Sequence, residues 1–410
     1  MLVLIYCSTV SYTQNSKKVL FLGNSYTSAN NLPSLISNLA LSTGDTMIYD
    51  SNTPGGSRLM DHAVNVTSIN KINADSWDFV VLQAQSQEPS WSDWQVGQEV
   101  FPYATQLCDM IEVNDSCTMP LFYMTWGRES GDALNCGSWP PVCTYEGMDS
   151  ILERNYRLMG EQNQGLVSPV GRVWRYLRTN YPAIDLYQAD GSHPSIYGSY
   201  AAACSFYTLI FQKDPTDITF DATLTANDAE IIRNVTRMIV FDSLELWGVG
   251  QYNPIADFSF SIQDSVLFCY NSSANAFNFS WSMGDGSFYT DTDVVHTYPI
   301  PGIYEVQLIA SKCQLQDTMT LVIEIGTSSI LKNELIPVVL FPNPTNNSLN
   351  IQFGKEIYAN YYVSDIHGRI YLENQFEGSE LQLDISHLSA GIYAIHFDSI
   401  EQISISFVKK

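Results

Sequence analysis

The chain has 410 residues, of which 45% are hydrophobic, and a formal net charge of −24 from 43 acidic and 19 basic residues. Its length predicts two or three domains. Its acidity argues against binding to nucleic acids or to anionic membranes, which both require a basic surface. The sequence has no run of about 18 apolar residues, so we expect no transmembrane helix.

Residues 1–16 open with an apolar run, Met1–Cys7, followed by small and polar residues. This order is typical of a secretory signal peptide, and because no basic residue precedes the run we expect its start to be missing. Cleavage is expected near Gln14 and would remove Cys7. A lipoprotein role for Cys7 is the alternative, which the bulky Tyr6 directly before it disfavours.

Residues 17–250 alternate short apolar runs with helical patterns. Five runs are predicted as strands: Val19–Gly23, Met47–Ser51, Asp78–Gln83, Pro120–Trp126 and Ile184–Gln188. Helical spacing occurs between and after them, in Gln98–Asp115, Met148–Gln164, Ile196–Phe211 and Ala226–Leu246. This alternation predicts a three-layer α/β/α domain with a parallel sheet. The carboxyl ends of such strands meet at one edge of the sheet, where ligands bind.

Ser25 lies at that edge, in the turn after the first predicted strand. Four apolar residues, Val19–Leu22, are followed by Gly23-Asn24-Ser25 and then by a helical pattern with Pro33 in its first turn. A serine in such a turn is exposed, and its backbone N–H is free to donate to an anion. A serine that only caps a helix has the same local pattern, so the turn alone does not decide.

A second polar turn, Asp190-Gly-Ser-His193-Pro194, precedes the helical run Ile196–Phe211. A serine nucleophile needs a base, and the base needs an orienting group. The three-residue spacing in a glycine-containing turn lets the Asp190 carboxylate reach Nδ1 of His193 while Nε2 faces outward. The two turns together predict a triad of Ser25, His193 and Asp190. A surface or capping histidine is the alternative.

Gly23-Asn24-Ser25-Tyr26-Thr27 resembles the first sequence block of the SGNH (GDSL-like) hydrolase superfamily, and Asp190–Pro194 resembles its last block. The resemblance covers about Lys17–Gly250. It implies a flavodoxin-like fold and a catalytic serine, histidine and aspartate at the three positions just named. It implies no metal and no organic cofactor.

The second block of the family contributes a glycine to the oxyanion hole. Ser51–Leu59 lies at the corresponding place in this chain. The resemblance therefore implies that the backbone N–H of Gly56, with Gly55 as the alternative, acts together with the N–H of Ser25.

The third block of the family normally ends in asparagine, whose side chain is a further oxyanion donor. The matching stretch here is Trp77–Gln87, and counting from Asp78 places Gln87 at the asparagine position. Glutamine is one methylene longer and its amide can still donate. Gln83 and Gln85 are the alternatives.

Two residues at and just beyond the end of the fourth predicted strand are candidates for substrate contact. Trp126 offers an aromatic ring and Arg128 a charge that can hold a substrate carboxylate. The insertion Arg128–Thr144 is rich in glycine, proline and cysteine. It is either a substrate wall over the edge of the sheet or only a stabilised surface loop.

The cysteines indicate an exported, disulfide-bonded chain. Seven remain after removal of Cys7, and pairing by nearness in sequence predicts the disulfides Cys108–Cys117, Cys136–Cys143 and Cys269–Cys313, leaving Cys204 free. Metal binding is the alternative, but the Cys and His spacings fit no zinc pattern.

Residues 254–326 change to period-two alternation without helical patterns, which predicts a β-sandwich. The runs Trp281–Gly286, His296–Tyr298 and Gly302–Tyr304 resemble the PKD module of the Ig-like class. Such modules imply a spacer, with glycan binding as the alternative.

Residues 335–410 form a third β region, predicted as a second small β-sandwich. Leu340–Thr345, Tyr362–Arg369, Leu388–Tyr393 and Phe407–Lys410 resemble, in order, the landmarks of the C-terminal sorting domain of the type IX secretion system of Bacteroidetes. The resemblance implies that the machinery of this system is a partner of 335–410. It also implies a secreted or surface-attached protein.

These features together predict a secreted serine esterase that works through an acyl-enzyme. The export address, the Ig-like module and the aromatic-rich edge favour an acylated carbohydrate as the substrate and deacetylation as the reaction. A lipolytic esterase is one alternative. A non-catalytic surface protein that binds glycans or mediates adhesion is the other.

Overall fold

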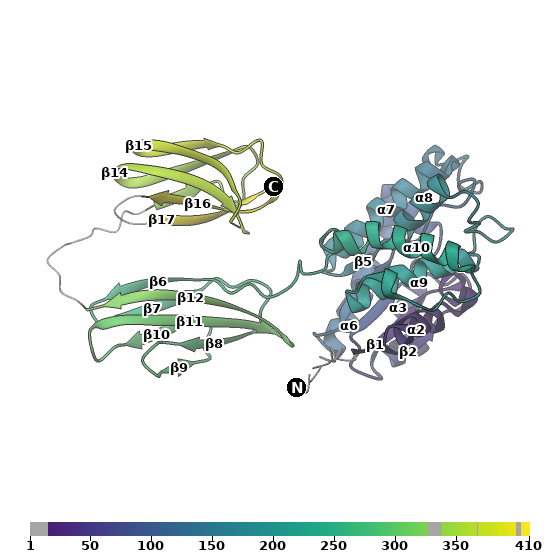
Figure 1. Cartoon of the computed structure of the whole chain (residues 1–410), viewed down its shortest axis with the longest axis horizontal. Coiled ribbons are helices and arrows are strands. Elements are labelled where there is room, and N and C mark those ends of the chain that lie inside the picture. Colours follow the sequence, from purple (N-terminus) through teal and green to yellow (C-terminus); the bar gives the residue numbers. More distant parts are fainter. Residues whose placement is uncertain (1–14, 327–337, 367, 399–402) are drawn as a thin grey trace, which may run out of the picture. The chain divides into compact units, whose positions relative to one another are not determined.

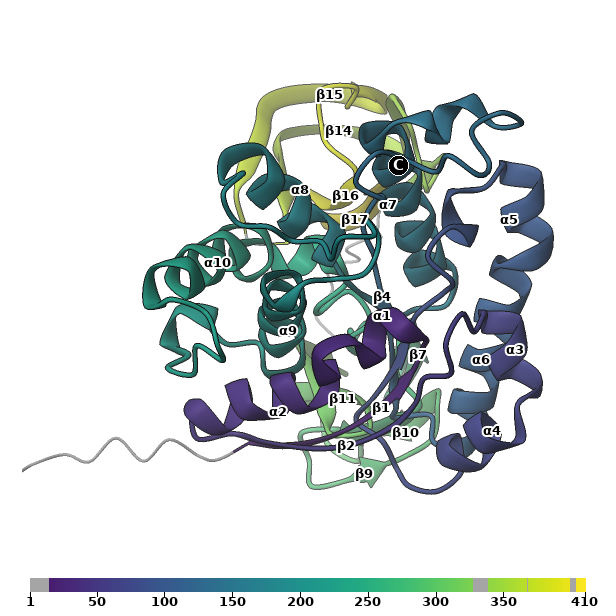
Figure 2. The same cartoon turned by 90° about the vertical axis from the view of Figure 1, so that its right-hand side faces the viewer.

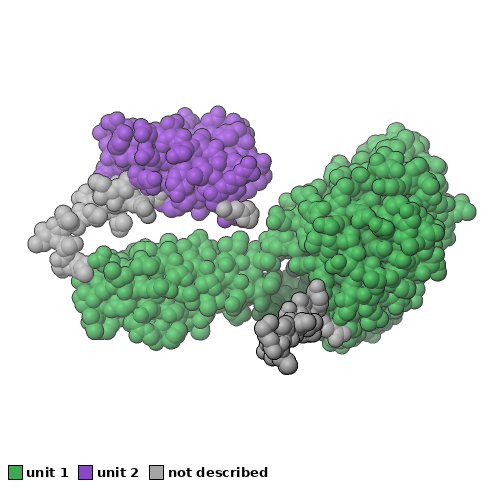
Figure 3. All heavy atoms as spheres, viewed as in Figure 1, with its two compact units in different colours: residues 1–326 green, residues 327–410 purple. Residues whose placement is uncertain are grey.

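The computed structural model describes residues 15–326, 338–366, 368–398 and 403–410. The chain divides into two compact units, residues 1–326 and residues 327–410 (Figures 1 and 3). The predicted signal peptide lies almost entirely outside the described residues. None of the helices in the described ranges is long and apolar enough to cross a membrane.

The first part of unit 1 is built on a five-stranded parallel sheet in the order β2-β1-β3-β4-β5. This strand order is that of flavodoxin-like folds, so the predicted fold class is confirmed. The strands are β1 (Ser16–Leu22), β2 (Thr46–Asn52), β3 (Phe79–Leu82), β4 (Met119–Tyr123) and β5 (Leu166–Ser168).

Helices cover both faces of this sheet, as Figure 2 shows, with α2 (Leu32–Ser42) and α9 (Ile196–Phe211) on one side and α3 (Leu59–Val64) and α6 (Phe101–Asn114) on the other. The remaining helices are α1 (Ser25–Ser28), α4 (Val66–Ile72), α5 (Asp93–Glu99), α7 (Tyr145–Gln162), α8 (Val170–Asn180) and α10 (Ala226–Ile239). Short 3₁₀ turns are η1 (Ala29–Asn31), η2 (Glu88–Ser90), η3 (Pro140–Cys143), η4 (Pro215–Asp217) and η5 (Phe241–Trp247).

The apolar runs of the sequence become the core of the sheet. Val19–Leu22 and Val80–Leu82 are fully buried, because helices cover the sheet on both faces and no alternation with polar residues is needed. Helix α9 is buried from Gly198 to Phe211, so it is apolar all round. The rigid ends of these strands carry the polar turns described below.

The fifth strand was predicted wrongly. It is β5, between α7 and α8, whereas Ile184–Gln188 contributes only an isolated bridge between Tyr187 and Pro194. The three residues of β5 are followed at once by Pro169, so they leave almost no pattern in the sequence. The Ile184–Gln188 segment instead pairs with the chain that follows it and braces the Asp190–His193 turn.

The second part of unit 1 contains two antiparallel sheets, in the orders β10-β7-β6 and β12-β11-β8-β9. Trp281, Val306 and Leu308 are fully buried in its core. The strands are β6 (Phe258–Gln263), β7 (Val266–Asn271), β8 (Asn278–Ser282), β9 (Phe288–Tyr289), β10 (Val294–Thr297), β11 (Gly302–Lys312) and β12 (Leu315–Ile325). This is the predicted β-sandwich.

Unit 2 is an antiparallel β fold with its own core, which includes Ile351, Val363 and Ile395. The strand order is β13-β14-β16-β17, and β15 pairs with β14. The strands are β13 (Val338–Phe341), β14 (Ser348–Asp365), β15 (Ile370–Asp384), β16 (Gly391–Asp398) and β17 (Ile403–Lys409).

Two disulfides join Cys136 to Cys143 and Cys117 to Cys313. The first pairing confirms the prediction, but the predicted pairs Cys108–Cys117 and Cys269–Cys313 are wrong. Cys117 and Cys313 are bonded to each other, while Cys108 on α6 and Cys269 in the core of the sandwich are buried free thiols. Both partners of the long-range bridge are exposed and lie on different domains. Nearness in sequence is therefore a poor guide to this bridge.

Candidate active site

Three side chains from two distant turns form a hydrogen-bonded chain. Oγ of Ser25 lies 2.9 Å from Nε2 of His193, and Nδ1 of His193 lies 2.5 Å from Oδ2 of Asp190. The carboxylate holds the proton on Nδ1, so Nε2 is left to accept a hydrogen bond from the serine hydroxyl. The structure thus brings together the three residues that the sequence predicted as a triad.

Asp190 is fixed by its own turn. Its Oδ1 accepts hydrogen bonds from the backbone N–H groups of Ser192, at 3.0 Å, and His193, at 2.9 Å. Partial burial acts to raise the pKa of Asp190, but the hydrogen bonds from the His193 ring and from these two N–H groups outweigh it and hold the pKa below its usual value. Gly191, at φ +64°, supplies the left-handed residue that the turn requires.

Gln83, which directly follows β3, forms hydrogen bonds with the turn that carries Ser25. Its Oε1 accepts from the N–H of Asn24 at 2.9 Å and from Oγ1 of Thr27 at 2.8 Å. Its Nε2 donates to Oδ1 of Asn24 at 2.8 Å. A Cβ at Gly23 would stand 2.7 Å from the same Oε1, so the close approach requires glycine. Gln83 is therefore fully used in supporting the nucleophile turn and is not available as an oxyanion donor.

Backbone N–H groups point to an anion site beside Ser25. In the described part of the chain, the N–H groups of Ser25, Gly55 and Gly56 donate no hydrogen bond. The glycine loop is attached to the nucleophile turn, because Nδ2 of Asn24 donates to the carbonyl of Ser57 at 3.0 Å. Gly56 has a φ of +73°. These free N–H groups are the ones that the resemblance implies as oxyanion donors, and that role stays a prediction.

The structure does not support Gln87 as the third oxyanion donor. Gln87 is buried and its Nε2 donates to Oδ1 of Asp132 at 2.7 Å, which ties the disulfide-bonded loop to the end of β3. Gln85 is the remaining alternative, since it is only half-buried and its Nε2 has a single long contact of 3.4 Å to Oε1 of Gln87.

An aromatic stack supports the histidine turn, and it corrects the role expected for Trp126. Trp126 is fully buried, so it does not contact substrate. Its ring is stacked between Tyr26, at 4.9 Å, and Trp174, at 3.6 Å between centroids, and its Nε1 donates to the carbonyl of Ser192. The Tyr26 ring packs edge-on against His193, and its hydroxyl contacts Oγ of Ser192 at 2.7 Å. Burial raises the pKa of Tyr26.

Asn30 was missed by the sequence reasoning. Its Nδ2 donates to the carbonyls of Pro194 and Ser195 and to Oγ of Ser199, at 3.1, 3.0 and 2.9 Å. This one amide therefore joins the turn after Ser25 to the start of α9. In the sequence, Asn30 is only an asparagine five residues beyond Ser25. A single asparagine does not indicate which groups its side chain will contact.

His62 is a second residue that the motifs did not reveal. It is buried on α3, its Nε2 lies 2.9 Å from the carbonyl of Gly23, and its Nδ1 lies 2.7 Å from Oγ of Ser68. Burial lowers the pKa of His62, and the hydrogen bond to Gly23 opposes this only in part. The neutral ring holds the end of β1 in place.

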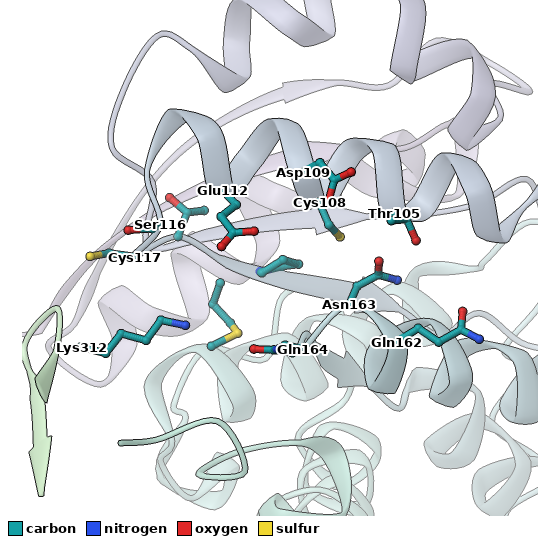
Figure 4. Close-up of a pocket in the computed structure, with 13 residues that line it drawn as sticks. Thr105, Cys108, Asp109, Glu112, Ser116, Cys117, Gln162, Asn163, Gln164 and Lys312 are labelled. Carbon is teal, nitrogen blue, oxygen red and sulfur yellow. The ribbon is translucent and has the colours of Figure 1, made fainter. Parts of the chain in front are cut away.

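The triad is open to solvent, with 35% of the His193 side chain and 48% of the Asp190 side chain exposed. Two hollows in the structure lie elsewhere. One of about 210 Å³ (Figure 4) and one of about 660 Å³ are both lined by Met119, at the start of β4, and hence lie at the opposite edge of the sheet.

Comparisons with known families identify the two β domains. Residues 254–325 match the family model of the PKD domain, and residues 339–410 match that of the secretion system C-terminal sorting domain. Both predictions are thereby confirmed. A sorting domain of this kind directs export through the type IX secretion system, so the protein is secreted or held at the cell surface.

Solved structures similar to the chain include a DUF4886 family protein from Bacteroides uniformis, with 16% identity and a TM-score of 0.48 over 56% of this chain and 97% of that one. A candidate SGNH hydrolase from Slackia heliotrinireducens has 24% identity and a TM-score of 0.40 over 47% and 98%. The PKD1 domain of the Vibrio cholerae metalloprotease PrtV has 24% identity and a TM-score of 0.18 over 18% and 99%. A search of curated protein sequences finds no match.

Proposed function

We propose that the protein is an exported serine ester hydrolase that acts on acylated carbohydrate. The observation that carries the proposal is the hydrogen-bonded chain from Ser25 through His193 to Asp190 at the carboxyl edge of the sheet. A serine hydroxyl, an imidazole and a carboxylate in this order are the groups that acyl transfer through a serine nucleophile requires.

In the proposed reaction, Oγ of Ser25 attacks the ester carbonyl while Nε2 of His193 takes its proton. The imidazolium that forms is stabilised by Asp190, which remains ionised. His193 then gives the proton to the departing alcohol, and the acyl group stays on Ser25. Water, activated by the same imidazole, attacks the acyl-enzyme and releases the acid.

In the proposed reaction the free N–H groups of Ser25 and Gly56 stabilise the oxyanion of the tetrahedral intermediate, with the amide of Gln85 as a third donor. Each such donor typically contributes about 10²–10³ in rate. Gln85→Ala should therefore lower kcat by a factor in this range, whereas Gln85→Asn keeps an amide on a shorter side chain. Hydrolysis of p-nitrophenyl acetate measures both, and an unchanged kcat in Gln85→Ala would remove this residue from the oxyanion site.

Carbohydrate is the proposed alcohol component for three reasons. The triad is exposed, which suits an ester group on a polymer. The chain carries an export domain, which places it where extracellular polysaccharides are found. A PKD domain follows the hydrolase domain and suits a spacer or a glycan contact.

The test is hydrolysis of p-nitrophenyl esters from acetate to octanoate by the full chain and by its Ser25→Ala variant, which retains the fold. We expect activity on acetate that the substitution removes, and labelling of the unmodified protein alone by a fluorophosphonate probe. A preference for octanoate would favour a lipolytic enzyme. Absence of labelling would favour a binding protein and overturn the proposal.

A further inference from the structure

One arginine in the first domain differs from the others in its surroundings. In the described part of residues 15–250, seven arginines form ion pairs with aspartate or glutamate: Arg58, Arg154, Arg157, Arg172, Arg175, Arg233 and Arg237. An eighth, Arg178, lies over the ring of Tyr145. Arg128 has neither kind of partner, although the chain carries 43 acidic residues.

The polar contacts of the Arg128 side chain are few. Its Nη2 donates to Oγ of Ser86 over a long 3.4 Å, and its Nε–H is buried without an acceptor in the described part of the chain. The neighbouring Glu129 lies against Gly191 instead of pairing with the guanidinium. The charge of this half-buried guanidinium is therefore not compensated by a carboxylate, which costs free energy. Such a cost indicates that the cation serves a function.

Arg128 belongs to the same edge as the triad. The residues on both sides of it are attached to the histidine turn, because Nε1 of Trp126 donates to the carbonyl of Ser192 at 3.1 Å and the N–H of Glu129 donates to the carbonyl of Gly191 at 2.9 Å. Ser86, its one side-chain partner, follows β3. The guanidinium therefore lies between the loop after β3 and the turn that carries His193.

We infer that Arg128 binds a carboxylate of the substrate, so that the ester hydrolysed is borne by an acidic sugar such as an acylated uronic acid. This inference rests on the proposed ester hydrolysis. The planar guanidinium donates two parallel hydrogen bonds to a carboxylate, which gives both orientation and selectivity. The acidity of the rest of the chain does not oppose this at physiological salt, where exposed charges are screened beyond about 8 Å.

The test compares two acetate esters of nearly the same shape, 4-acetoxybenzoate and the neutral 4-acetoxybenzamide, in 0.15 M salt. The readout is the ratio of kcat/KM for the charged ester to that for the neutral one. We expect Arg128→Gln to lower this ratio by about tenfold to a hundredfold, since hydrogen bonds to charged groups have this weight. Arg128→Lys should lower it less. Arg157→Gln, which removes a paired arginine on α7, is the matched control and should leave the ratio unchanged.

An equal ratio in the unmodified protein and in Arg128→Gln would overturn the inference. So would a wild-type protein that prefers the neutral ester. Mono(4-nitrophenyl) succinate, which carries the charge on the acyl side, shows on which side of the ester the carboxylate binds. If Arg128→Gln lowered kcat/KM for this succinate ester and left the ratio for the two acetate esters unchanged, the acidic-sugar assignment would be contradicted.

Failure of the proposed hydrolysis would be recognised separately, because neither ester would then show turnover that Ser25→Ala removes. In that case binding of 4-acetoxybenzoate is measured by calorimetry to the unmodified protein and to Arg128→Gln. Weaker binding to the variant would show that Arg128 binds a carboxylate on a non-catalytic protein. Equal binding to both proteins would overturn the assignment of Arg128 as a carboxylate site. Circular dichroism checks that each variant is folded, and Arg128→Lys substitutes if Arg128→Gln is not.

Discussion

Several residues around Ser25 and His193 position the triad and are not themselves members of it. Asn30 is the clearest example, since one amide contacts three acceptors at the start of α9. Its backbone has a φ of +52°, a conformation that glycine adopts without strain. The effect of losing the Asn30 amide can therefore be separated from the effect of backbone strain by comparing two substitutions, to alanine and to glycine.

We expect Asn30→Ala and Asn30→Gly both to lower kcat on p-nitrophenyl acetate by about tenfold, with a smaller effect on KM, because hydrogen bonds of about 1 kcal/mol each are lost in both. Steady-state kinetics checks this. If Asn30→Gly retained the wild-type kcat, backbone strain and not the amide would be the cause of the effect in Asn30→Ala.

His62 gives the stability of the α/β domain, residues 17–250, a predictable dependence on pH. The unfolded chain binds a proton at this histidine near pH 6.5, and the folded chain binds it only at lower pH because burial lowers the pKa. Between these two values the unfolded state carries more protons. The stability from His62 is therefore complete above about pH 6.5 and is lost as the pH falls towards the folded pKa.

The measurement is the urea midpoint of the α/β domain, followed by tryptophan fluorescence at a series of pH values from about 5 to 8. The unmodified protein should lose stability across the lower part of this range. His62→Gln, which has no titrating group, should show a flatter dependence. Parallel curves for the two proteins would show that another group is responsible.

At the residue scale the sequence was informative where a motif combines several residue types at fixed spacing. Ser25, Asp190 and His193 were predicted in this way, because a nucleophile, a base and an orienting carboxylate each need a particular side chain. Gln83 and Trp126 were given the wrong kind of role. A glutamine or a tryptophan serves equally well in a core or in a site, and only its neighbours distinguish the two.

At the scale of elements, the loops after β2 and β3 are joined by a partly buried ion pair. Arg58, at the start of α3, contacts the buried carboxylate of Glu88 in η2 and also the carboxylate of Glu99 at 2.7 Å. The Glu88 side chain is only 2% exposed. These two loops carry Gly56 and Gln85, so the ion pair fixes the distance between the proposed oxyanion donors.

We expect Arg58→Met to destabilise the α/β domain by about 3–5 kcal/mol, because it leaves a buried carboxylate without its cation. The double variant Arg58→Met/Glu88→Met should recover most of this loss. The exposed pair of Arg154 with Asp93 is the control, and Arg154→Met should cost about 1 kcal/mol or less. Urea unfolding measures all three, and a double variant no more stable than Arg58→Met would contradict the argument.

The elements themselves were predictable where their patterns are long. Helix α9 has the predicted bounds because sixteen residues without a charge lie between a serine cap and Gln212. The fifth strand was missed because β5 has only three residues. The order of the sheet also requires contacts between strands far apart in sequence, for which one sequence carries no direct signal.

At the scale of the whole molecule, the division into an α/β domain and two β domains follows from changes in periodicity that are visible in the sequence. The pairing of the cysteines was not visible, because Cys117 and Cys313 are 196 residues apart. Burial raises the pKa of the free thiols Cys108, Cys204 and Cys269, which makes them unreactive.

Mass spectrometry of a non-reduced digest should therefore find the peptides of Cys117 and Cys313 joined to each other. Iodoacetamide should modify the three free cysteines only after the protein is unfolded. A digest in which Cys117 is joined to Cys108, or Cys313 to Cys269, would show that the bridge between the domains does not form.

The same bridge changes what a proteolytic nick can do to the exported protein. A protease outside the cell that cuts the backbone once between Cys117 and Cys313 produces two chains, yet the bond between the sulfur atoms still holds them as one molecule. Ser25 and His193 would remain in one molecule even when the cut falls between them in sequence. After a cut between the two cysteines, the part that carries Ser25 separates from the segment that carries the export address only when a reductant also breaks the bridge.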